Sequence, residues 1–77
     1  MGYFLKDFVR RQDGSWAVVY TNYVEMNGRY ESMAFPCNQE GKVIGSIFDD
    51  RLRYRLYKGE ADARKGHEAI INELRAA

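Results

Sequence analysis

The sequence has little of what usually stabilises a very small protein. It contains one cysteine, Cys37, among 77 residues, so no disulfide can form within the chain. It also contains one histidine, His67, and these two soft ligands are too few for a zinc site. A single domain spanning residues 1–77 has a small core. Self-association is then the remaining source of stability, and we expect a homo-oligomer.

Neither sign of charge dominates the composition. The 12 lysines and arginines against 11 acids leave a formal net charge of +1. This balance is unlike that of a general nucleic-acid or membrane binder, but it leaves room for a local basic patch. No apolar run approaches the length of a membrane span, and no secretory signal opens the sequence. We therefore expect a cytoplasmic protein without membrane contact, with Cys37 reduced.

No catalytic, metal-binding or phosphate-loop motif stands out, so the sequence predicts neither an enzyme nor a cofactor. His67 would need an oriented nucleophile or carboxylate to act as a general base. We interpret it as a packed, hydrogen-bonded structural residue. Nothing near Cys37 in the sequence would lower the pKa of its thiol, which favours an inert cysteine. Asp49 and Asp50 lack the ligand spacing of a calcium loop and indicate a turn.

The segment from Glu60 to Leu74 has the periodicity of an amphipathic α-helix. Apolar positions recur at steps of three and four along one face. These positions are Ala63, Gly66, His67, Ile70, Ile71 and Leu74. Glu60 precedes Arg64 by four residues, a spacing that stabilises a helix slightly. Because glycine is unfavourable inside a helix, Gly66 predicts a close approach to an aromatic residue of the sheet.

Four segments before this helix have the composition and alternation of β-strands. They cover residues 3–11, 16–26, 29–35 and 51–57. Asp13-Gly14 and Asn27-Gly28 predict tight two-residue hairpin turns, and Pro36 is expected to end the third strand. Residues 43–48 are ambiguous between strand and irregular structure. The sequence thus predicts an α+β fold, an antiparallel meander of three to four strands with one C-terminal helix on one face (β-β-β-β-α).

The last predicted strand has two contrasting faces. We expect its apolar face, Leu52, Tyr54 and Leu56, to pack under the helix. The other face is then left to solvent or to a partner. Arginine side chains hold phosphate oxygens through two hydrogen bonds, and a tyrosine ring offers a stacking surface. This face is therefore a candidate site for a nucleotide-like anion or for nucleic acid. The alternative is a solvated face paired with acids such as Glu25 or Glu31. The candidate residues are Arg51, Arg53, Arg55 and Tyr57.

A mismatch between the sheet and its cover predicts a binding surface. One helix can cover only one face of a four-stranded sheet, yet the first two strands are apolar on both faces. The uncovered face would expose a large apolar patch, which favours a second copy, a host protein or a ligand against it. Tryptophan and tyrosine are common at binding surfaces, although they also favour ordinary strand packing. The candidate residues are Trp16, Tyr20, Tyr23 and Tyr30.

Three short motifs resemble a family of small bacteriophage and prophage proteins. They are Tyr30-Glu31-Ser32-Met33-Ala34-Phe35, Arg53-Tyr54 and the helical run from Ala61 to Glu68. Members of that family carry Tyr-Glu-Thr-Met, an aliphatic residue and Phe, followed by a C-terminal helix with Ala-x-x-Gly-His. Here Ser32 and Ala34 stand in place of the threonine and the aliphatic residue. The resemblance covers roughly the second half of the chain and implies a phage accessory protein in a bacterial host, with no catalytic residues.

These expectations combine into one functional hypothesis with two alternatives. The leading hypothesis is a non-enzymatic accessory protein that blocks a host factor or sequesters a small anionic ligand, in an anti-defence role. The first alternative is a nucleic-acid-binding module that uses the basic strand face. The second is a structural component of the virion.

Overall fold

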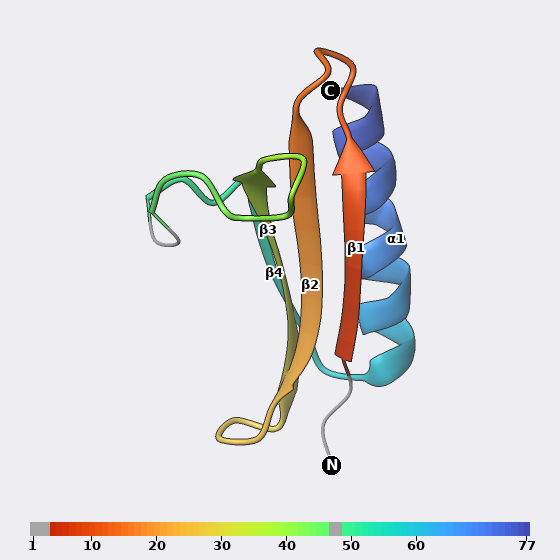
Figure 1. Ribbon diagram of the computed structural model, residues 1–77. Helices are drawn as coiled ribbons and strands as arrows, with labels where there is room; N and C mark the ends of the chain where they lie inside the picture. The colour runs from red at the N-terminus through yellow and green to blue at the C-terminus, as the bar shows by residue number, and fades with distance from the viewer. Residues whose placement is uncertain (1–3, 47–48) are drawn as a thin grey trace.

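A computed structural model describes residues 4–46 and 49–77 of the chain and confirms the predicted fold class. The four strands form one antiparallel sheet in the order β1-β2-β3-β4, and a single helix follows them (Figure 1). The elements are β1 (Phe4–Arg10), β2 (Trp16–Val24), β3 (Arg29–Cys37), β4 (Arg53–Tyr57) and α1 (Glu60–Ala76). Each sequential pair of strands is adjacent in the sheet, as expected for a meander.

The hairpin turns lie at the predicted glycines, but the connections are longer than two residues. Gly14 and Gly28 have φ angles of 88° and 65°, in the left-handed region that glycine adopts at little cost. The ladder closes at the pairs Arg10–Trp16 and Val24–Arg29, so the loops cover residues 11–15 and 25–28. Both hairpins are therefore confirmed, whereas the prediction of two-residue loops is wrong.

Pro36 does not end β3, contrary to the prediction. It lies in register with Ala17 of β2, and Cys37 follows it in the strand. The carbonyl of Pro36 accepts a hydrogen bond from the amide of Ile44 at 2.9 Å. Because N–H and C=O of one strand residue point to the same side, the missing N–H of proline also faces Ile44. No hydrogen bond to β2 is lost, so proline is tolerated here.

The helix covers one face of the sheet and forms the main core there (Figure 1). Three of its predicted apolar residues meet small and β-branched residues of the first three strands. The buried cluster comprises Val9, Ala17, Val19, Ala34, Ile70, Ile71 and Leu74. Within the described part of the chain, no helix has the length and apolar character needed to cross a membrane.

At one end of the sheet, the loop after β3 covers the face opposite the helix. Val18, Phe35 and Cys37 are buried there, and Val43 from the loop after β3 packs against them. Val43 also forms an isolated bridge with Cys37. In the ambiguous segment 43–48, residues 47 and 48 lie outside the described residues, as does Tyr3 of the first predicted strand. The loop thus covers part of the face that we expected to be fully open.

Leu52, just before β4, packs against the helix-side cluster as predicted, but the orientation predicted for β4 itself is wrong. Arg53 and Arg55 point toward the helix, whereas Tyr54 and Leu56 lie on the opposite face, 43% and 45% exposed. The register explains this orientation, since Arg53 pairs with a small alanine and Arg55 with a serine on β3. These small neighbours leave room for the long aliphatic stems of arginine, which cover apolar surface while the charged ends reach outward.

Candidate functional site

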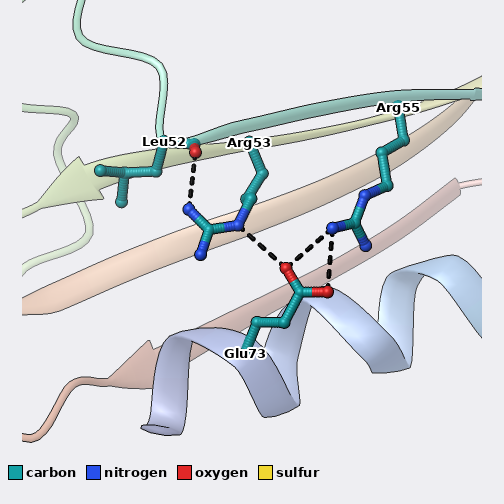
Figure 2. A network of polar contacts seen from close by, with 4 residues as sticks. All are labelled: Leu52, Arg53, Arg55 and Glu73. Carbon is teal, nitrogen blue, oxygen red and sulfur yellow. Dashed lines mark hydrogen bonds and ion pairs between the residues drawn. The ribbon is translucent and has the colours of Figure 1, made fainter. Parts of the chain in front are cut away.

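Glu73 of α1 binds both arginines of β4 (Figure 2). Arg53 Nε donates to Glu73 Oε1 at 3.0 Å, while one terminal nitrogen of Arg55 donates to both carboxylate oxygens, at 2.8 and 2.9 Å. Arg53 also donates to the carbonyl of Leu52 at 2.8 Å. Hydrogen bonds between charged groups are shorter and stronger than neutral ones. The network therefore ties the outermost strand to the end of the helix.

This network changes the interpretation of the predicted basic face. Hydrogen bonds from Arg53 and Arg55 lower the pKa of the Glu73 carboxyl, so the carboxylate neutralises part of their charge. Tyr57 shares their side of the sheet and packs over the helix at Gly66. Arg51 alone lies elsewhere, exposed and with its guanidinium carbon 4.2 Å from the centroid of the Tyr54 ring. The four residues do not form one exposed anion site.

Replacing Glu73 with glutamine should lower the free energy of unfolding by about 0.5–1 kcal/mol at neutral pH. The effect is modest because the three side chains are 34% to 38% exposed and are screened by water. A carboxyl whose pKa is lowered by folding stabilises the fold above the pKa of the unfolded glutamate, about 4.3. That stabilisation is lost as the pH falls from there through the lowered pKa of the folded state.

Urea denaturation at a series of pH values measures this effect. The difference between the wild type and Glu73→Gln should shrink toward zero on acidification. Glu68→Gln is the matched control, since it removes the same charge at an exposed position of the same helix and should change stability by less than about 0.5 kcal/mol. A pH-independent difference for Glu73→Gln would contradict the ion-pair interpretation.

His67 lies at the centre of a chain of hydrogen bonds between the helix and the sheet. Its Nε2 is 2.7 Å from Asp7 Oδ2 on β1, and its Nδ1 is 2.7 Å from Thr21 Oγ1 on β2. Thr21 in turn bonds to the hydroxyl of Ser32 on β3. A carboxylate only accepts hydrogen bonds, so Nε2 carries a hydrogen and donates a hydrogen bond to Asp7. In the neutral imidazole, Nδ1 then accepts from Thr21, and Ser32 donates to Thr21.

The sequence of carboxylate, imidazole and hydroxyl is that of many hydrolases, but the burial here favours a structural role. Thr21 and Ser32 have 0% exposed surface and His67 has 1%, so neither hydroxyl is presented to a substrate. Asp7 is the only half-exposed member, at 52% for its side chain. The network holds three strands against the helix, which confirms the structural interpretation of His67.

The predicted aromatic residues are divided between the two faces of the sheet. Tyr23 and Tyr30 lie on the helix side, with ring centroids 5.0 Å apart, and Tyr30 is in register with Tyr57. Trp16 and Tyr20 lie on the other side and pack against the second buried cluster. Tyr20 meets Phe35 edge to face, with ring centroids 6.3 Å apart. Part of this group therefore has the predicted ordinary packing role.

The face of the sheet away from α1, which the 38–46 loop covers only in part, is the best candidate for a functional site. One row of side chains crosses it in register, from Lys6 through Tyr20 and Met33 to Tyr54. The Lys6 ammonium lies 5.2 Å from the Phe8 ring and 5.4 Å from the Tyr20 ring. We call this surface the open face, and it comprises Lys6, Phe8, Tyr20, Met33, Arg51, Tyr54 and Leu56.

Most of the open face was not predicted from the sequence. Tyr54 and Leu56 were expected under the helix, and no sequence pattern distinguished Lys6 or Phe8. One sequence feature does indicate the orientation of β4. Ser32 and Ala34 on β3 are small, and they leave space for long side chains of β4 only on the helix side.

Within the described residues, the remaining candidate groups, Cys37 and Asp50, are not arranged as a catalytic or metal-binding site. Cys37 is buried, and burial raises the pKa of its thiol, which makes it unreactive. Asp50 lies in the predicted turn, where its carboxylate accepts from the amide of Ser46 at 2.7 Å. Residues 4–46 and 49–77 contain no pocket and no group of three or more potential metal ligands.

Comparison of the chain with protein-family models, with curated proteins and with solved structures finds no match.

Proposed function

We propose that this chain is a non-enzymatic binding protein whose contact surface is the open face. The observation that supports this proposal most directly is the pair Tyr54 and Leu56, about half exposed side by side on β4. Phe8, 48% exposed, is a further exposed apolar side chain on β1, beside the loop at Gly41. Contiguous exposed apolar side chains with polar neighbours are typical of interaction sites.

The open face supports a macromolecular partner more than a small anion. Sequestration of a nucleotide-like anion was expected through Arg53 and Arg55, whose guanidinium groups are already bound by Glu73. A surface that has aromatic side chains and no pocket among the described residues suits a large partner that contacts several of them at once. The resemblance to bacteriophage proteins adds a setting for this proposal, a bacterial cell in which the bound host component is blocked.

Photocrosslinking in bacterial cells tests the binding function without assuming a partner. Benzoylphenylalanine in place of Tyr54 should form crosslinks to a macromolecule, whereas the same residue in place of Lys65, on the exposed side of α1, should not. Adding Leu56→Glu should abolish the crosslinks from position 54, because it buries a charge in the contact. Equal crosslinking from both positions, or none from position 54, would contradict the proposal.

A further inference from the structure

We propose that the partner of the open face is single-stranded nucleic acid, with bases stacked on its aromatic rings and phosphates held by Lys6 and Arg51. This inference rests on the proposed binding function and names its partner class. It differs from the basic-strand hypothesis, because it uses residues on the face opposite Arg53 and Arg55.

The first support is how the charges are distributed between the two faces of the sheet. On the helix side, each charged strand residue has a partner on the helix, since Arg53 and Arg55 bind Glu73 and Asp7 accepts a hydrogen bond from His67. On the other side, alternation along the strands places one acid among several cations. The strand residues concerned are Lys6, Arg10, Arg29 and Glu31, and Arg51 joins them from the segment before β4. The strands thus present three cations and one acid on this side of the sheet, a local positive charge that complements a polyanion.

The second support is that the cations lie beside aromatic rings. Arg51 lies over Tyr54 at one end of the row across the sheet, and Lys6 lies near Tyr20 and Phe8 at the other end. Proteins that bind single strands combine a cationic surface for the backbone with rings on which bases stack. Strands are spaced about 4.8 Å apart, so the rings of Tyr20 and Tyr54, two strands apart, lie on the order of 10 Å from each other. That separation suits two bases of one extended strand.

The exposed rings on the sheet favour single-stranded over double-stranded nucleic acid. Exposed rings on a sheet can stack only on bases that are not already stacked within a duplex. The hydroxyl of Tyr54 donates to Glu31 at 3.3 Å, which holds the ring in place on the surface. A ring held in place loses little entropy when a base stacks on it. The surface is therefore suited to unpaired bases.

Fluorescence anisotropy with labelled oligothymidylate and oligouridylate of about 12 nucleotides tests this proposal. We expect saturable binding at low ionic strength and weaker binding to a duplex of the same length. Tyr54→Ala should weaken binding roughly 5- to 100-fold through the loss of one stacked base. Lys6→Gln and Arg51→Gln should each reduce the slope of log affinity against log salt by about 0.7. Lys65→Gln on the exposed side of α1 is the control and should change neither quantity.

Two results would overturn the proposal. One is the absence of saturable binding to both oligonucleotides. The other is binding that Lys65→Gln weakens as much as Lys6→Gln, or that Tyr54→Ala leaves unchanged. If position 54 crosslinks to protein alone and no oligonucleotide binds, the nucleic-acid partner is wrong while the binding function stands. If position 54 crosslinks to nothing, the binding function is also wrong.

Discussion

Replacing His67 with alanine should lower the free energy of unfolding by about 4 kcal/mol. The change leaves a cavity where a fully buried ring was, and truncations of that size cost about 2–5 kcal/mol. It also leaves Thr21 without its acceptor in a site that water does not reach, which adds about 1–3 kcal/mol. A protein of this length has a total stability on the order of 4–12 kcal/mol, so the variant should be close to unfolded at 25 °C.

Urea denaturation followed by the fluorescence of Trp16, the single tryptophan, measures this loss. Thr21→Val is the second variant, because it keeps the side-chain volume and removes only the hydroxyl that links His67 to Ser32. We expect it to fold and to lose about 2 kcal/mol. Lys65→Ala should change stability by less than about 0.5 kcal/mol. A loss below about 1 kcal/mol for both buried variants would show that the network is not a structural link.

Replacing Gly66 with alanine should destabilise the protein by about 2 kcal/mol, although alanine is the better helix former. At an open helical position this change would stabilise by about 1 kcal/mol. Here the added Cβ would overlap the ring and hydroxyl of Tyr57, so the helix must move away from β4 or the ring must leave its site. Forcing extra volume into a packed contact costs about 1–3 kcal/mol. The expected sign is therefore opposite to that given by helix propensity.

A double-mutant cycle with Tyr57→Leu distinguishes this contact from a general effect on the helix. Leucine removes the ring, so Gly66→Ala should cost less in that background, with a coupling free energy of about 1–3 kcal/mol. Gly59→Ala is the matched control, because nothing lies within 4 Å of an added Cβ at that position. Its effect should stay below about 1 kcal/mol. Additive losses in the cycle would refute the Gly66–Tyr57 contact as the cause.

Local patterns in the sequence account for the fold class, while the orientation of β4 depends on distant residues. Strand alternation, the two glycine turns and the helical periodicity each act over a few residues, and all three led to the observed β-β-β-β-α order. The faces of β4 could not be assigned in the same way. Apolar residues usually face a helix. Here Arg53 and Arg55 face it instead, because the carboxylate of Glu73, 20 and 18 residues later, accepts their hydrogen bonds.

The same limit applies to the candidate site. The structural role of His67 was predicted from its place on the apolar stripe, yet its partners could not be, since Thr21 and Asp7 lie 46 and 60 residues away. The packing of Val43 over Val18 and Phe35 could not be predicted either, because residues 38–46 have no periodic pattern. As a result, the uncovered face was expected in the right place but was overestimated in extent, and its exposed aromatic on β4 was assigned to the wrong side.

The charges on the two outer strands have a consequence for how this protein meets copies of itself. A sheet with unprotected edges invites another chain to add a strand, and natural proteins oppose this with charged side chains that point inward from the edge. Asp7 on β1 and Arg53 and Arg55 on β4 are such side chains, held by His67 and Glu73. An incoming strand would have to accommodate these charges beside its own side chains. Strand addition is therefore disfavoured at both edges of the sheet, which should remain in contact with water.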